Sequence, residues 1–74
     1  MYGILGGKFA IITADYDEVI TIRDQLKELD LFERFSYDVG RMIYLVYLKT
    51  VDTNNYKSLY SLVHDNKYRL VKCY

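Results

Sequence analysis

The chain has 74 residues, with ten basic and ten acidic side chains, nine tyrosines, one cysteine and one histidine. This length predicts one small domain with a thin core, and so few cysteines and histidines exclude an internal disulfide and argue against a structural zinc site. No apolar run approaches the roughly 20 residues that span a bilayer, and no signal-like leader opens the chain, so we expect a cytoplasmic protein without a membrane anchor.

The chain begins with a glycine-rich segment that a strand and a helix follow. We expect residues 1–7 to be flexible and residues 8–74 to form a single domain. Residues 9–14, FAIITA, are aromatic and β-branched and predict a buried strand. Asp15, with a glutamate three positions later, predicts the start of a helix over residues 16–29. The apolar stripe of this helix consists of Val19, Ile22, Leu26 and Leu29.

Two further strands follow the first helix. Residues 34–39 alternate between apolar and polar side chains, which predicts a half-exposed strand. Gly40 then supplies the residue at which the chain reverses. Residues 41–49 form the most apolar stretch of the chain and predict a central strand.

A second helix and a last strand complete the pattern. The helix is expected to begin at Asp52 or Thr53 and to stop at Asn66 in a left-handed conformation, and residues 68–74 predict the last strand. The core stripe of this helix consists of Tyr56, Leu59, Tyr60 and Val63.

The predicted order is β-α-β-β-α-β, with the two most apolar strands at residues 9–14 and 42–48. This order resembles the ferredoxin-like (split βαβ) fold, an α+β fold with a four-stranded antiparallel sheet and two helices on one face. The resemblance implies that strands one and three occupy the middle of the sheet, in agreement with their apolar sequences.

The strand over residues 42–48 has no polar side, whereas a sheet covered on one face should present polar groups on the other. We therefore predict an interface on the uncovered face, with either a second copy in a homodimer or another protein. The alternative is that the N-terminal segment, or outward-facing tyrosine hydroxyls, make that face compatible with water. The residues predicted for this interface are Phe9, Ile11, Tyr44 and Tyr47.

Charge is unevenly distributed along the chain. Residues 1–38 hold eight acidic and four basic side chains, a balance of −4, and residues 39–74 hold two acidic and six basic side chains, a balance of +4. Such asymmetry can steer a partner, unless the folded halves interleave and cancel the two fields. The acidic surface of the first helix is predicted to contact a partner through Asp17, Asp24, Glu28 and Asp30.

Other chemistries find little support in the sequence. An RNA-recognition motif would stack bases on aromatic residues where this chain has Ile43 and Leu45, and the net charge is zero, so nucleic-acid binding is not expected. The acidic residues near Asp15 are explained by helix capping rather than by a metal. His64 and Cys73 lack a recognisable catalytic partner in the sequence. We expect neither catalysis nor a cofactor.

The composition itself carries a resemblance. Without proline or tryptophan, and rich in Tyr, Asn, Lys and Ile, the chain resembles the small proteins by which phages and mobile elements inhibit host machinery, anti-CRISPR proteins among them. The resemblance implies a non-catalytic binder in the host cytoplasm that acts by steric block or by mimicking an acidic ligand. An alternative is a small-molecule-binding regulatory domain of the ACT type, with its ligand near residues 15–17. A dimeric α+β barrel enzyme would need a carboxylate or histidine on the uncovered face of strands one or three, which they lack.

Overall fold

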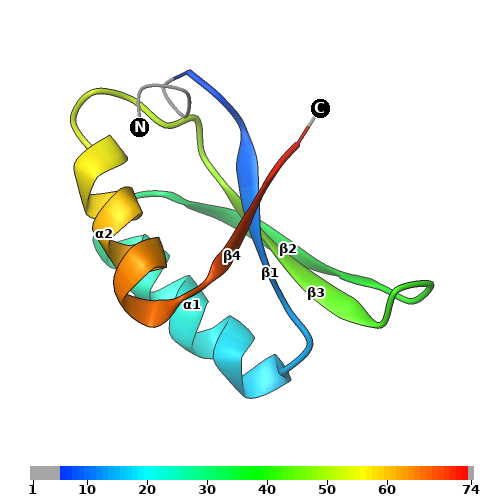
Figure 1. The fold of residues 1–74 in the computed structure, drawn as a ribbon. Helices are drawn as coiled ribbons and strands as arrows, with labels where there is room; N and C mark the ends of the chain where they lie inside the picture. Colours follow the sequence, from blue (N-terminus) through cyan, green and yellow to red (C-terminus); the bar gives the residue numbers. More distant parts are fainter. Residues whose placement is uncertain (1–5, 74) are drawn as a thin grey trace.

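The computed structural model describes residues 6–73 and shows a four-stranded antiparallel sheet with two helices packed on one face (Figure 1). Its elements, in chain order, are β1 (Phe9–Thr13), α1 (Tyr16–Glu28), β2 (Phe32–Asp38), β3 (Ile43–Leu48), α2 (Tyr56–Asn66) and β4 (Arg69–Lys72). The strands lie side by side in the order β2-β3-β1-β4. This order confirms the predicted α+β fold class and is that of the ferredoxin-like fold.

The core lies between the helices and the two central strands. Phe9 and Ile11 of β1 and Val46 and Leu48 of β3 form its sheet side, with Ile11 paired directly opposite Val46. The helices and loops contribute Val19, Ile22, Leu26, Leu31, Val51 and Leu59. None of these side chains is more than 8% exposed, so the helices close this face over both central strands.

Helix α1 follows the sequence pattern closely. The Asp15 carboxylate accepts a hydrogen bond from the backbone N–H of Asp17 and so caps the first turn, as predicted. The helix ends in a Schellman motif, in which Asp30 is left-handed (φ 55°) and the N–H of Leu31 donates to the carbonyl of Leu26. Leu26 and Leu31 are both buried, which fixes the direction in which the chain leaves the helix.

Helix α2 begins later than predicted, because Asp52 stabilises the turn that precedes it. The carboxylate of Asp52 accepts from the backbone N–H groups of Asn54 and Asn55, and the first helical residue is Tyr56. The left-handed residue that ends the helix is Lys67 (φ 57°), not Asn66 as predicted. Asn66 instead donates its side-chain amide to the carbonyl of Leu62.

One member of the predicted α2 stripe is not in the core. Leu59 is fully buried and Tyr56 and Val63 pack against the core, but Tyr60 is 48% exposed. Leu62 packs against the core instead, because the buried face of the helix is rotated toward α1.

The β2–β3 hairpin extends away from the helices (Figure 1). Gly40 lies in its turn, but the residue with the left-handed backbone is Met42 (φ 56°). Strand β2 starts at Phe32, two residues earlier than predicted. The register shifts between Phe32 and Arg34, a β-bulge at Glu33, so the alternation of apolar and polar side chains becomes regular only from Arg34 onward.

Most of the N-terminal segment predicted to be flexible, residues 1–5, lies outside the described residues. The two described glycines of this segment, Gly6 and Gly7, hydrogen-bond to the backbone of Val51. The N–H of Gly6 donates to the Val51 carbonyl, and the N–H of Val51 donates to the Gly7 carbonyl.

Candidate functional site

The sheet face opposite the helices is the strongest candidate surface, and strand register defines its members. Arg34, Ser36 and Asp38 of β2 pair with Tyr47, Leu45 and Ile43 of β3, and Leu45 in turn pairs with Ile12 of β1. Paired residues share a face of an antiparallel sheet. The resulting surface, here named the open face, comprises Ala10, Ile12, Arg34, Ser36, Asp38, Ile43, Leu45, Tyr47, Arg69 and Val71.

The centre of the open face is apolar. Ile12, Leu45 and Val71 come from three adjacent strands and line a shallow depression together with Tyr47. Each of these side chains is partly exposed, in contrast to Ala10, which is fully buried. Nothing in residues 6–73 covers this depression, so it offers a partner a hydrophobic contact of several side chains.

Basic side chains surround this apolar centre. The guanidinium of Arg34 lies 4.0 Å from the centroid of the Tyr47 ring, a cation–π arrangement that holds Arg34 over the face. Arg41 also lines the depression, and Arg69 points to the same side as Ile12. The tyrosine ring thus has one side occupied by a cation and is not a free stacking surface.

Two carboxylates partly neutralise this positive charge. Lys8 Nζ donates to Glu33 Oε1 at 2.8 Å, and Arg41 Nε lies 3.3 Å from Asp38 Oδ2. The hydrogen bond from Lys8 is the main cause that lowers the pKa of Glu33 below its usual 4.5. Counting both pairs, and Lys72, which also lines the depression, five bases and two acids lie on or beside the open face, a balance of +3.

Only one of the four residues predicted for the sheet-face interface lies on the open face, namely Tyr47. Phe9 and Ile11 are buried beneath the helices, so their assignment is corrected, and Ala10 and Ile12 face outward in their place. Tyr44 also lies on the helix side, where it packs against the core. Because β1 is apolar on both sides, its sequence could not show which side faces the helices. The polar side of β2 does show this, since the strand register places it on the same face as Leu45 and Ile12.

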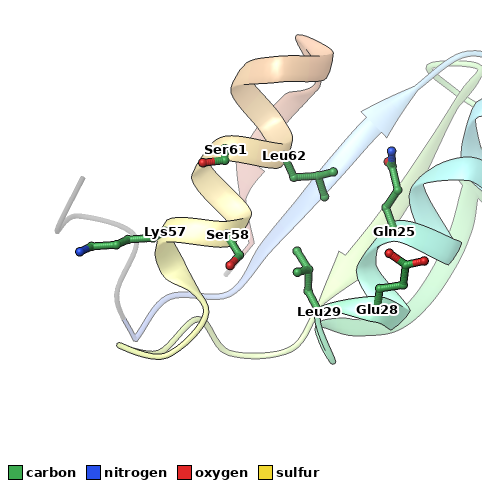
Figure 2. Close-up of a pocket in the computed structure, with 7 residues that line it drawn as sticks. All are labelled: Gln25, Glu28, Leu29, Lys57, Ser58, Ser61 and Leu62. Atoms are coloured by element: carbon green, nitrogen blue, oxygen red, sulfur yellow. The ribbon is translucent and has the colours of Figure 1, made fainter.

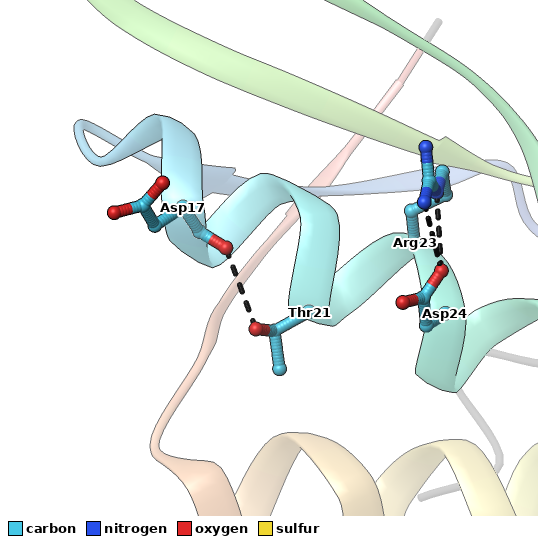
Figure 3. A network of polar contacts seen from close by, with 4 residues as sticks. All are labelled: Asp17, Thr21, Arg23 and Asp24. Carbon is cyan, nitrogen blue, oxygen red and sulfur yellow. Dashed lines mark hydrogen bonds and ion pairs between the residues drawn. The ribbon is translucent and has the colours of Figure 1, made fainter.

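The predicted acidic surface of α1 is present in part. Asp17, Asp24 and Glu28 are exposed and lie at positions i, i+7 and i+11, which places them along one line of the helix. Figure 3 shows Asp24 bound by Arg23 and the carbonyl of Asp17 accepting from the Thr21 hydroxyl. The remaining predicted residue follows the helix and is paired elsewhere, because Asp30 Oδ1 lies 3.0 Å from Lys49 Nζ.

A groove separates the two helices (Figure 2). Leu29, the residue that follows the last residue of α1, and Leu62 of α2 reach into it from opposite sides, while Lys57 points away. Near this groove, Tyr68 Oη donates to Gln25 Oε1 at 2.7 Å and joins the start of β4 to α1. Partial burial, followed by the charge of Glu18, raises the pKa of Tyr68 above its usual 10.0.

An aromatic cluster near the start of α1 was not predicted from the sequence. The ring of Tyr44 lies 5.6 Å from that of Tyr16 and 4.6 Å from that of Tyr37, measured between centroids. Tyr16 and Tyr37 are 50% and 45% exposed, and Phe35 beside them on β2 is 39% exposed. Helix α1 therefore leaves the outer aromatic residues of β2 uncovered.

Within residues 6–73, no three His, Cys, Asp or Glu side chains come together in a way that could hold a metal ion, and no helix of this part is long and apolar enough to cross a membrane. The segment after β1, where the ACT-type alternative places its ligand, is engaged in capping: Asp15 donates its N–H to Thr13 Oγ1 while its carboxylate accepts from the N–H of Asp17.

Comparison with protein-family models, curated proteins and solved structures gave no match.

Proposed function

We propose that this chain is a non-catalytic protein-interaction module whose partner binds the open face. The observation that carries the proposal is the apolar depression formed by Ile12, Leu45, Tyr47 and Val71 on a sheet face that no helix covers. Protein interfaces combine an apolar centre with a polar rim, enriched in tyrosine and arginine. The open face has both elements, with Tyr47 central and Arg34, Arg41 and Arg69 around it.

The charge of the open face favours a partner with carboxylates around an apolar contact. Two copies placed face to face would oppose a balance of +3 to another of +3, and like charges across an interface disfavour association. A different protein with an acidic rim fits this surface better. Single-stranded nucleic acid fits less well, because the face centre is mainly aliphatic and one side of the Tyr47 ring is occupied by Arg34.

The compositional resemblance to phage inhibitors supports a more specific form of the proposal. A chain bound through its open face would block that part of its partner sterically, in the cytoplasm of a host cell. The line of Asp17, Asp24 and Glu28 on α1 lies on the opposite side of the molecule. Asp24 is paired with Arg23 there, while the exposed carboxylates of Asp17 and Glu28 remain available to imitate an acidic ligand.

The test is quantitative affinity capture from a cell extract with four forms of the immobilised protein: wild type, Leu45→Asp, Arg69→Glu and Tyr60→Ser. The first two substitutions place negative charge on the open face, and the third changes an exposed residue of α2 as a control. We expect one protein to be retained by the wild type and by Tyr60→Ser, and at least about tenfold less by either open-face variant, as for a residue central to an interface. The interaction is then measured with the purified pair.

Thermal unfolding of all four forms establishes that the open-face variants remain folded. Equal retention by all four forms would refute the open face as the binding surface. The proposal would also be refuted if the immobilised protein retained nucleic acid and nuclease treatment abolished all retention. The partner would then be a nucleic acid and not a protein.

A further inference from the structure

Strand β2 forms one edge of the sheet and is poorly protected against pairing with another strand. It is the first strand of the order β2-β3-β1-β4, so one side of its backbone faces no strand of the described chain. Exposed edges are templates for pairing, and proteins usually guard them with short strands, charges or bulges. The other edge, β4, has only four residues, with a charged residue at each end. β2 has seven residues, its bulge lies at the start, and the charges that bound its regular part, Arg34 and Asp38, are opposite in sign, whereas both ends of β4 are basic.

The regular part of β2 runs from Arg34 to Asp38 and presents large apolar groups. Phe35 and Tyr37 face the helix side of the sheet, yet they remain 39% and 45% exposed. Two uncovered aromatic residues on an edge strand predict that the edge is occupied in the functional protein.

The sequence Arg34-Phe-Ser-Tyr-Asp38 is complementary to itself in the antiparallel sense. With a two-fold axis at Ser36, Arg34 of one copy lies opposite Asp38 of the other, and Phe35 lies opposite Tyr37. We infer that two copies of this chain pair through their β2 edges in this register and form one continuous eight-stranded sheet. Each dimer then has two cross-strand Arg–Asp pairs on the open-face side and two Phe–Tyr pairs on the helix side.

Neighbouring registers lack this complementarity. An axis at Arg34 would place two guanidinium groups opposite each other, and an axis at Phe35 would place Arg34 opposite Ser36. An axis at Tyr37 would leave Arg34 without a partner in the regular strand and would place Ser36 opposite Asp38. Register is set by such cross-strand matches, so the axis at Ser36 is favoured.

This dimer does not depend on the proposed function. It uses the backbone at the edge of the sheet and shares only Arg34 and Asp38 with the open face, whereas the partner is proposed to bind that face around Leu45 and Val71. A two-fold axis perpendicular to the sheet keeps both open faces on the same side and leaves them accessible.

The test is a pair of charge exchanges followed by sedimentation equilibrium. Alone, Arg34→Asp brings two carboxylates together at each pair, and Asp38→Arg brings two guanidinium groups together. Each single variant should weaken the dimer about tenfold or more, since two attractive pairs become repulsive. An equimolar mixture of the two variants restores both opposite-charge pairs, so a heterodimer of near wild-type affinity is expected. The double variant Arg34→Asp/Asp38→Arg should also recover the dimer.

The mixture and the double variant control for contacts that each substitution removes within its own chain. Arg34→Asp loses its contact with Tyr47 and Asp38→Arg loses its pair with Arg41, and neither mixing nor combining the variants returns these contacts. Arg69→Asp, on the opposite edge, should leave the association unchanged. A wild-type chain that stays monomeric up to about 1 mM would overturn the inference. The inference would also be overturned if the equimolar mixture of Arg34→Asp and Asp38→Arg dimerised no better than either variant alone. It would be overturned as well if Leu45→Asp abolished the dimer while neither Arg34→Asp nor Asp38→Arg weakened it.

Discussion

At the scale of single residues, Tyr68 forms a part-buried side-chain hydrogen bond to Gln25. It links the residue before the last strand to the first helix at Gln25, one of the residues that line the groove shown in Figure 2. Tyr68→Phe removes the hydroxyl and leaves the Gln25 carbonyl without this donor. We expect the free energy of unfolding at neutral pH to fall by about 0.5–1.5 kcal/mol, measured by urea denaturation. Tyr60→Phe, at an exposed residue, should change it little.

The same tyrosine predicts a pH dependence of stability. Its pKa in the folded chain is raised, first by burial and then by Glu18, so the folded state holds this proton more tightly than the unfolded state. The resulting stabilisation is complete below the unfolded value of about 10 and is lost as the pH rises through the folded pKa. The stability difference between wild type and Tyr68→Phe should therefore shrink above about pH 10. A difference that grows with pH would contradict the assigned direction.

Neighbouring residues show where sequence pattern is insufficient. Leu59 and Tyr60 both fit the apolar stripe of α2, but one is fully buried and the other is 48% exposed, because two adjacent positions are separated by about 100° around a helix. Likewise, both sides of β1 are apolar, so the pattern could not decide between Ile11 and Ile12. Only contacts with the rest of the fold make these choices.

At the scale of the elements, both helices end in Schellman motifs whose left-handed residue is not glycine. In α2 this residue is Lys67, with the N–H of Tyr68 donating to the carbonyl of Val63. A side chain in this conformation costs roughly 1–2 kcal/mol, partly offset by the flexibility that glycine adds to the unfolded chain. Lys67→Gly should therefore raise the free energy of unfolding by about 0.5–1 kcal/mol in urea denaturation.

The matched control is Lys27→Gly, the same substitution within helix α1. There glycine should lower the free energy of unfolding by roughly 1 kcal/mol, because the helical backbone offers no advantage for glycine. Opposite signs for the two substitutions would support the assigned backbone conformations. Destabilisation by both would argue against a left-handed residue at Lys67.

Most of the elements could be predicted, because long periodic segments carry strong signals. The order of the elements and the start of α1 at Tyr16 follow from apolar patterning and from the Asp15 cap, whereas the order of the strands in the sheet is implied by the resemblance to the ferredoxin-like fold. The start of α2 could not be placed, since Asp52 stabilises a turn with the same hydrogen-bonding groups that would cap a helix. The bulge at Glu33 leaves no recognisable pattern, yet it determines which β2 side chains share the open face.

At the scale of the whole molecule, the two halves of the sequence do not form two separate charged bodies. Strand β1 lies between β3 and β4, so the halves interleave. The charge difference runs instead between the two faces of the sheet, and the bases around the open face come from both halves, as Arg34 and Arg69 illustrate. A linear charge count could not reveal this arrangement, because it depends on strand register.

The two helices are anchored to the sheet unequally. Helix α1 contributes three fully buried side chains, Val19, Ile22 and Leu26, whereas α2 contributes only Leu59. The first turn of α2 also lacks a side-chain hydrogen bond from its N-cap residue, Asn55. Regions with few buried apolar contacts open at lower free energy than the global transition. In native-state hydrogen exchange, the amides of α2 should therefore show lower opening free energies than those of α1, β1 and β3.

Leu59→Ala provides the sharpest form of this prediction. A buried leucine replaced by alanine typically costs about 2–5 kcal/mol, and here Leu59 is the side chain by which α2 is most deeply buried. If α2 opens on its own, the substitution should accelerate exchange in α2 far more than in β1 and β3. If the small domain unfolds only as one unit, all slowly exchanging amides will lose the same free energy, and the difference in anchoring will have no dynamic consequence. Opening of α2 would also widen the groove of Figure 2 while leaving the open face intact, because that face is built from the sheet alone.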